Sequence, residues 1–258
     1  MNVKIARVSE IVRAHSPLVV AYSGGVDSTC LLALAHRAVG EGMLGVIADS
    51  PSLPRASLDE ALRNAKLIGA NIEVLPTQEF SDENYVSNPP NRCYFCKAEL
   101  FTQLDRLASE RGFAAIAYGE NADDRADLRP GSKAAREFSV IAPLRDAGLT
   151  KAEVRDVSRE LGLPTHDAPA QPCLSSRIPH GTRVTPEALA LVEDGEAFVR
   201  SMGFRVFRVR FSPGPPVGAR VQISPDEFPA MVGREDELVA GLVSVGFQAV
   251  DIDPEGYR

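Results

Sequence analysis

A short loop with two glycines, residues 23–28 (SGGVDS), carries the clearest chemical signal in the sequence. It follows an apolar run at residues 17–23 that predicts a buried strand, and it leads into a segment that predicts a helix. Two glycines let the backbone approach an anion closely, and a helix N-terminus supplies free N–H groups and a partial positive charge. Ser23 and Ser28 can add hydroxyl donors, and Asp27 can cap the helix or hold a cation. We predict that this loop binds phosphate groups.

Three of the four cysteines are candidates for metal binding or catalysis. Cys93 and Cys96 form a C-x-x-C motif at the start of a predicted helix, and Cys173 lies in the segment QPCLSSR at residues 171–177. Cys30 falls in an apolar run on the first predicted helix and is interpreted as a small core residue. Four cysteines in a chain of this size are not expected to form disulfides in a cytoplasmic protein.

The three cysteines allow four interpretations, which their spacing alone does not separate. They can hold a [4Fe–4S] cluster that leaves one iron open. They can bind a structural zinc ion, with His166 or His180 as the fourth ligand. Cys93 and Cys96 can form a redox pair that serves a nucleophilic Cys173, or all three can be ordinary thiols.

Short apolar runs alternate with helical patterns over residues 1–165. Near-continuous apolar strands between helices are typical of a parallel sheet covered on both faces, which predicts a doubly wound α/β domain. In such a sheet, ligands bind beyond the carboxyl ends of the strands, where the glycine loop would lie. The predicted strands span residues 17–23, 43–49, 71–75, 113–118 and 139–144, and the predicted helices span 26–39, 53–69, 96–111 and 150–161.

The pattern changes after residue 163. Residues 164–186 are punctuated by Pro and contain no convincing element. A small α+β unit is predicted after them, with helices at 186–202 and 226–245 and strands at 204–211, 219–223 and 247–253. We therefore expect two domains, at residues 1–170 and 171–258.

The composition excludes several classes of protein. The 258 residues are 44% hydrophobic and carry a net charge of −7 at pH 7, so a broad nucleic-acid-binding face is not expected. No run approaches the roughly 20 apolar residues of a membrane helix. The first residues lack the apolar block of a signal peptide. We expect a cytoplasmic protein without nucleic-acid or membrane partners.

The loop SGGVDS resembles that of the PP-loop ATP pyrophosphatases, which binds the pyrophosphate of ATP. The wider pattern is similar to the LarE family of ATP-dependent sulfurtransferases, and the similarity spans most of residues 20–211. The matching stretches are SGGVDS (23–28), RCYFCK (92–97), GENADDRADLRPG (119–131), PCLSSRIPHGTRVT (172–185) and FRVRF (207–211). The resemblance implies a PP-loop domain followed by a smaller domain for substrate and sulfur transfer.

The resemblance also implies a reaction. The enzyme would adenylate the two carboxylates of pyridinium-3,5-biscarboxylate mononucleotide, release pyrophosphate and AMP, and form thiocarboxylates in nickel-pincer nucleotide biosynthesis. Relatives with all three cysteines are similar to cluster-bearing members, so the resemblance favours a [4Fe–4S] cluster on Cys93, Cys96 and Cys173. In simpler relatives the cysteine that matches Cys173 gives up its own sulfur and becomes dehydroalanine, which is the alternative.

Residue roles follow from the same resemblance. Glu120, Asp123 and Asp124 are candidates for contact with Mg²⁺, which prefers oxygen ligands. The implied ATP-binding residues are Ser23, Gly24, Gly25, Asp27, Ser28, Lys97, Asp123 and Arg125, and the implied residues for the nucleotide substrate are Ser176, Arg177, Arg208 and Arg210. Arg208 and Arg210 alternate along a predicted strand and so face the same side. Analogy with family members further suggests a homo-oligomer.

Three other functions stay open on the sequence alone. A tRNA thiolase of the PP-loop group can also bind a three-cysteine cluster, although the acidic charge balance counts against RNA binding. An amidotransferase would use ammonia and would leave the cysteines without a purpose. A sensor would bind ATP or a cluster without turnover.

Overall fold

The computed structural model describes residues 2–124 and 130–257. Contacts divide the chain into two compact units. The first comprises Met1–Asp82 and Asn91–Gln171, and the second comprises Glu83–Pro90 and Pro172–Arg258. The segment Glu83–Pro90, which the sequence pattern assigned to the first domain, thus makes its contacts in the second unit.

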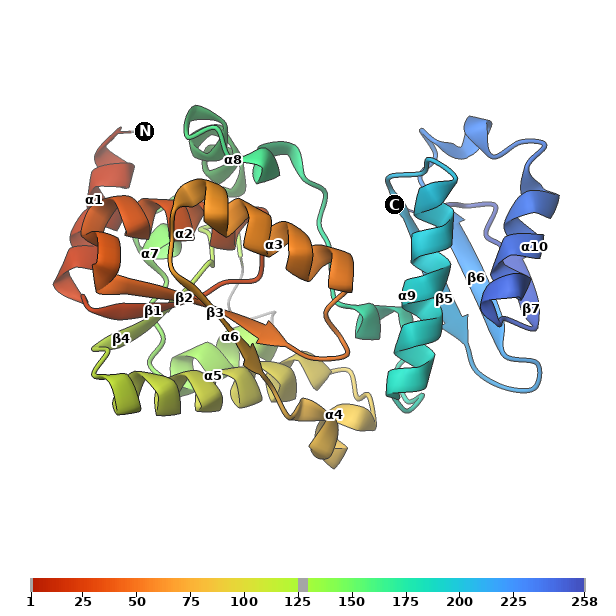
Figure 1. Ribbon diagram of the computed structural model, residues 1–258, viewed down its shortest axis with the longest axis horizontal. Helices are drawn as coiled ribbons and strands as arrows, with labels where there is room; N and C mark the ends of the chain where they lie inside the picture. Colours follow the sequence, from red (N-terminus) through yellow and green to blue (C-terminus); the bar gives the residue numbers. More distant parts are fainter. Residues whose placement is uncertain (1, 125–129, 258) are drawn as a thin grey trace. The chain divides into compact units, whose positions relative to one another are not determined.

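A four-stranded parallel sheet forms the centre of the first unit (Figure 1). Its strands are β1 (Leu18–Ala21), β2 (Met43–Asp49), β3 (Ile72–Pro76) and β4 (Ala115–Tyr118), in the order β3-β2-β1-β4. The chain moves outward from β1 to β3 and then returns to place β4 on the other side of β1. The carboxyl ends of β1 and β4 therefore form the point where the strand order reverses, which is where open α/β sheets bind ligands.

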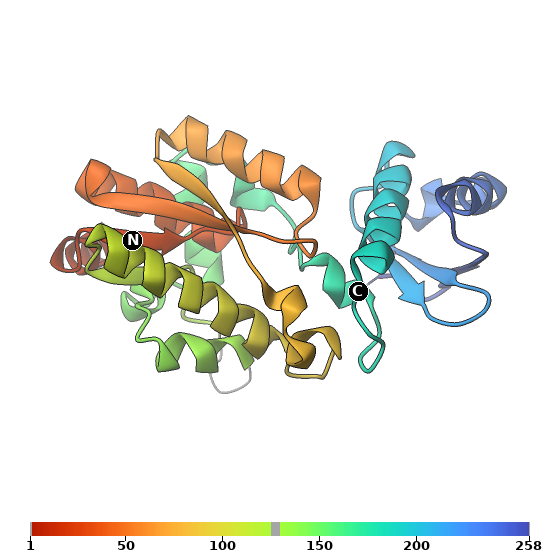
Figure 2. The same cartoon turned by 60° about the horizontal axis from the view of Figure 1, so that its bottom comes forward.

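Helices cover both faces of this sheet, as Figure 2 shows. Leu18 and Val20 of β1 pack on one side with α1 (Asn2–Ala14), α2 (Val26–Val39), α3 (Arg55–Ile68) and α8 (Lys151–Glu160). Val19 packs on the other side with α5 (Arg92–Arg111) and α6 (Pro130–Glu137). The predicted doubly wound α/β fold is confirmed. None of the helices in the described parts of the chain is both long enough and apolar enough to cross a membrane.

The second unit is built on a mixed sheet of three strands. They are β5 (Phe207–Ser212), β6 (Gly218–Ile223) and β7 (Ala249–Ile252), with β5 antiparallel and β7 parallel to β6. Val209 and Val221 face a core that also contains residues of α9 (Pro186–Ser201) and α10 (Glu235–Val245). The α+β character predicted for this part of the chain is confirmed. Short elements complete the chain: α4 (Glu83–Val86), α7 (Pro143–Asp146) and 3₁₀ turns at Gly40–Gly42, Glu79–Ser81, Pro164–Asp167, Leu174–Arg177 and Phe228–Ala230.

The structure corrects several of the predicted elements. Residues 139–144 are not a strand, because Ile141 makes a single bridge to Ala117 and Pro143 then begins α7. Proline lacks the N–H that a ladder needs, and its fixed φ suits the first turn of a helix. The helix expected at 226–245 starts only at Glu235, after a turn in which Gly233 has a φ of 80°. Helix α5 begins at Arg92 rather than at residue 96, and α6 was not predicted.

A capping box fixes the start of α8. The Thr150 hydroxyl accepts the Glu153 N–H, and Glu153 Oε2 accepts the Thr150 N–H at 2.9 Å. Lys4 Nζ donates to both carboxylate oxygens of Glu153, at 2.6 and 2.7 Å. These hydrogen bonds, that from Lys4 first, lower the pKa of Glu153 to about 2. Both contacts favour the charged form, so the carboxylate stays ionised well below its usual range.

Glu153→Gln is expected to reduce the free energy of unfolding at pH 7. Because the folded-state pKa is depressed, the contribution is complete above the ordinary pKa of 4.5 and is lost as the pH falls toward 2. Urea unfolding of the wild type and the variant at pH 7 and pH 3 measures this, and the difference should shrink at pH 3. Glu10→Gln, in the exposed Arg7–Glu10 pair, is the control. An equal loss for Glu153→Gln at both pH values would contradict the assignment.

Candidate functional site

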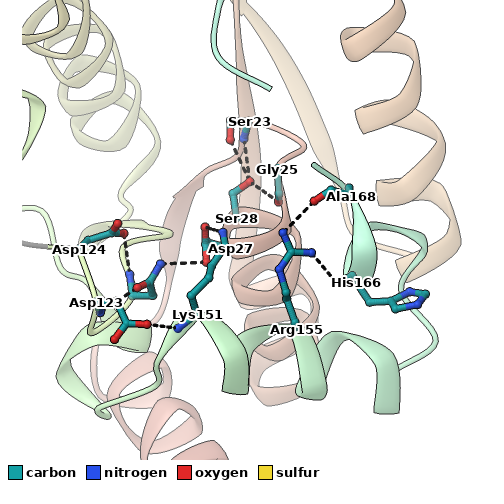
Figure 3. Close-up of polar contacts among 11 residues, drawn as sticks. Ser23, Gly25, Asp27, Ser28, Asp123, Asp124, Lys151, Arg155, His166 and Ala168 are labelled. Carbon is teal, nitrogen blue, oxygen red and sulfur yellow. Dashed lines mark hydrogen bonds and ion pairs between the residues drawn. The ribbon is translucent and has the colours of Figure 1, made fainter. Parts of the chain in front are cut away.

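The predicted phosphate loop lies at the reversal point of the sheet and is closed by its own hydroxyls (Figure 3). The Ser23 N–H donates to Ser28 Oγ at 3.2 Å, and Ser28 Oγ donates to the Gly25 carbonyl at 3.1 Å. The two serine oxygens are 3.0 Å apart. Gly25 is the N-cap of α2 and offers no side-chain cap. The first N–H groups of α2 are therefore not covered by a cap, which suits an anion.

Two glycines permit close approaches around this loop. Gly24 has a φ of 77°, and a Cβ at that position would lie 2.7 Å from the Cβ of Ala61 on α3. Gly119 follows β4, and a Cβ there would lie 2.7 Å from the Ser28 nitrogen. Glycine at 119 thus allows the segment after β4 to rest directly on the first turn of α2.

The segment after β4 holds the loop aspartate from one side. Asn121 is buried, and its Nδ2 donates to Asp27 Oδ1 at 3.2 Å. Asn121 Oδ1 accepts the Asp123 N–H at 2.9 Å, and the Asn121 N–H donates to Asp124 Oδ2 at 3.1 Å. Asp123 Oδ2 accepts the Lys151 N–H at 2.8 Å and so engages the first turn of α8. The structure therefore brings Asp27, Asp123 and Asp124 to one edge of the sheet, as Figure 3 shows.

Lys151, which the sequence analysis did not single out, holds Asp27 from the other side. Its Nζ lies 2.6 Å from Asp27 Oδ2. The T-x-x-E capping pattern at residues 150–153 was visible in the sequence and marks the start of α8. Nothing in the sequence showed that α8 begins beside α2, because the two residues are 124 positions apart.

A second charged network lies behind the segment after β4. Glu120 is buried and accepts hydrogen bonds from the Tyr118 hydroxyl and from Arg145 Nη1. The Arg145 N–H donates to the Glu120 carbonyl at 3.0 Å. Lys97 Nζ lies 4.9 Å from the centroid of the Tyr118 ring, in a cation–π contact. Lys97 on α5 is thereby placed at the carboxyl end of β4. Arg125, also predicted to bind ATP, lies outside the described residues.

The cysteines differ sharply in their surroundings. Cys30 is fully buried, and desolvation raises the pKa of its thiol to about 12, so it is a neutral core residue. Cys93 is exposed and Cys96 half-buried in the first turn of α5, three residues apart and so on neighbouring positions of one helix face. Cys173 is half-buried and belongs to the second unit. Among the described residues, no group of three His, Cys, Asp or Glu side chains is arranged to hold a metal ion.

Arg177 organises the loop that carries Cys173. The Arg177 guanidinium is buried and pairs with the Glu196 carboxylate through Nε and Nη2, at 2.8 and 3.0 Å. Nη1 donates to the carbonyls of Pro172 and Cys173 and to Ser176 Oγ. All three guanidinium nitrogens therefore donate to groups of the protein itself.

The segment Glu83–Pro90 holds the same loop and was not recognised in the sequence. Asn88 is fully buried with a φ of 57°, and its Nδ2 donates to the carbonyls of Ile178, Pro179 and Thr182 at 2.8–3.3 Å. The hydroxyls of Tyr85 and Ser175 are 2.8 Å apart. An Asn that adopts a left-handed backbone can be suspected only from the turn-forming sequence SNPP around it.

The predicted arginine pair lies on the polar face of the second sheet. Arg208 and Arg210 are opposite Gln222 and Arg220 of β6, on the face away from the core. Arg210 Nη1 donates to the Ser176 carbonyl at 3.3 Å. Burial, followed by the positive charge of Arg177, lowers the pKa of Arg208. Clustered cations of this kind favour a bound anion, because an opposite charge relieves their repulsion.

Comparison with known proteins identifies full-length relatives. A pyridinium-3,5-bisthiocarboxylic acid mononucleotide synthase of Lactiplantibacillus plantarum is 33% identical over 93% of this chain and 86% of its own length. An uncharacterised protein of Synechocystis is 41% identical over 93% of this chain and 89% of its own length. A glutamine-hydrolyzing GMP synthase of Methanopyrus kandleri is 29% identical over 70% of this chain and 62% of its own length. No protein-family model matches the chain.

Gly24→Ala is expected to destabilise the first unit more than Gly112→Ala. Both glycines have a left-handed φ, 77° and 74°, so each alanine adds strain of about 1–2 kcal/mol. The Gly112 position has no atom within 4 Å of the added Cβ, whereas at Gly24 buried Ala61 must also move. Urea unfolding of both variants measures the difference. Equal losses would show that the approach of α3 does not constrain the loop.

Glu196→Ala is expected to lower the free energy of unfolding of the second unit by about 3–5 kcal/mol, because it leaves Arg177 buried without its counter-ion. The side chains of this pair are 4% and 7% exposed. Glu83→Ala, which breaks the exposed ion pair with Arg183, is the control and should change stability little. Similar effects of the two variants in urea unfolding would refute the role assigned to Arg177.

Proposed function

Because this chain belongs to the LarE family, the family of pyridinium-3,5-bisthiocarboxylic acid mononucleotide synthases, we propose that it is an ATP-dependent sulfurtransferase acting on pyridinium-3,5-biscarboxylate mononucleotide. The relatives in the GMP synthases mark it more generally as an ATP-using enzyme of the PP-loop class. The observation that carries the proposal is the uncapped α2 N-terminus behind a glycine loop, at the reversal point of a parallel sheet.

The first half of the reaction activates a carboxylate. A carboxylate is a poor acyl electrophile, and adenylation turns one of its oxygens into part of a good leaving group. A substrate carboxylate oxygen attacks the α-phosphorus of ATP, and the bond to pyrophosphate breaks. Ser23, Gly24, Gly25 and Ser28 would bind the phosphates through N–H and hydroxyl groups. Lys97 and Arg125 would add positive charge to the same site.

Acidic residues at the same edge supply oxygen ligands for Mg²⁺, which usually reaches proteins through one or two carboxylates. Asp27 and Asp123 are the candidates, because their carboxylates lie on the loop and on the segment that contacts it. Glu120 is supported less well, since Arg145 and Tyr118 already bind its carboxylate.

The second half of the reaction would use the second unit. Sulfide or a thiolate attacks the acyl carbon of the adenylate, and AMP leaves with the oxygen. Arg208 and Arg210 would bind the phosphate of the mononucleotide with Ser176, whose carbonyl Arg210 contacts. Arg177 would act on this site chiefly by holding the Cys173 loop, because its nitrogens already donate to Glu196 and to that loop.

The chemistry of Cys93, Cys96 and Cys173 fits a [4Fe–4S] cluster, since thiolates are its ligands and all three side chains are at least partly exposed. When bound, such a cluster supplies a transferable sulfide at the iron that the protein does not ligate. Cys93 and Cys96 would provide two ligands from one turn of α5, and Cys173 the third. The alternative within the same function is that Cys173 donates its own sulfur.

We expect protein purified without oxygen to contain about four irons and four or more acid-labile sulfides per chain. Cys93→Ala, Cys96→Ala and Cys173→Ala should each lose them, whereas Cys30→Ala, in the core, should keep them. With Mg·ATP and the dicarboxylate mononucleotide, the wild type should release pyrophosphate and form a product in which sulfur replaces oxygen.

The outcomes separate the alternatives. Absence of both pyrophosphate and a sulfur-containing product would refute the proposed function. Stoichiometric zinc would make the cysteines structural and would refute the cluster. A metal-free protein that loses the mass of H₂S from Cys173 after one turnover would replace the cluster with sacrificial chemistry.

A further inference from the structure

Lys151 places a positive charge on the phosphate loop without belonging to any of the motifs that mark the site. Its Nζ lies 2.6 Å from Asp27 Oδ2, and the two side chains are 39% and 20% exposed. An ammonium group has three donors. Asp27 is the partner that the described residues give it, and Figure 3 shows the Lys151 side chain extending from α8 toward the start of α2.

We infer that Lys151 is a phosphate-binding residue that exchanges partners. In the ligand-free protein it pairs with Asp27, and when ATP binds it donates to an oxygen of the pyrophosphate portion. This inference rests on the proposed ATP chemistry of the loop and adds a residue to it.

The electrostatics of the loop support the exchange. Asp27 is the second residue of α2, so its carboxylate stands where a bound phosphate would also stand, and like charges repel. Pairing with Lys151 cancels that repulsion before the nucleotide arrives. A hard divalent cation that enters with the nucleotide prefers carboxylate oxygen and would take over Asp27. The ammonium would then be free to bind phosphate, and a half-exposed ion pair costs little to rearrange.

The start of α8 does not need the ammonium group for its own structure. The backbone N–H of Lys151 is bound by Asp123, and the Thr150–Glu153 capping box closes the first turn. Arg155, one turn later, donates to the carbonyls of His166 and Ala168 at 2.8 and 2.9 Å and fixes the helix to the segment that follows it. The long side chain of Lys151 is thus anchored at its base by other residues and variable only at its tip.

The test compares ligands that contain or lack the pyrophosphate portion. Binding of Mg·ATP, Mg·pyrophosphate and AMP is measured by calorimetry for the wild type, Lys151→Met, Lys151→Arg and Lys4→Met. Lys151→Met should weaken Mg·ATP and Mg·pyrophosphate by about tenfold or more, as expected for a lost charged hydrogen bond, and leave AMP unchanged. Lys151→Arg should retain most of the binding because it keeps the charge.

Lys4→Met is the matched control. Lys4 also places its Nζ 2.6 Å from a carboxylate of the first turn of α8, that of Glu153, but it does not contact the loop. It should bind all three ligands as the wild type does. Ligand-free melting curves establish that each variant is folded.

Two results would overturn the inference while the proposed function stands. Equal weakening of all three ligands by Lys151→Met would mean that Lys151 only shapes the loop, and unchanged binding would mean that its pair with Asp27 is static. A wild-type protein that binds neither Mg·ATP nor Mg·pyrophosphate would instead refute the proposed function, and the inference with it.

Discussion

The contact between Gly119 and the first turn of α2 is the constraint on which the candidate ATP site depends. Because no side chain intervenes, the segment after β4 approaches the Ser28 nitrogen closely enough for Asn121 to reach Asp27. The same segment then bonds to the start of α8, which carries Lys151. A larger residue at 119 would separate these elements together, since each is positioned through the others.

The two units use charged groups in opposite ways. In the first, Asp27 and Lys151 are partly exposed, so their pairing can be rearranged by a ligand. In the second, Arg177 and Glu196 are withdrawn from solvent, and their bidentate pair serves as a rigid bracket for the Cys173 loop. A site that must exchange substrates and a loop that must present one sulfur atom accurately thus call for different degrees of burial.

Local signals were sufficient for the fold, and long-range contacts account for what was missed. The β1–loop–α2 unit was predictable because apolar period, glycines and helix start occur within some twenty consecutive residues. The run at 139–144 has the same apolar character as a strand, and only its proline distinguishes it. Lys151 and Asn88 were missed because their roles depend on partners 124 and about 90 residues away. The roles predicted for the cysteines and arginines remain predictions.

The excursion of Glu83–Pro90 into the second unit has a consequence for the modularity of the protein. The chain passes between the units at three places, after Asp82, after Pro90 and after Gln171. A fragment cut at the last of these would lack the Asn88 amide that three carbonyls of the Cys173 loop accept from. The second unit is therefore not a cassette that recombination could append to an unrelated partner in one step. The two units are interleaved in sequence and must be inherited together.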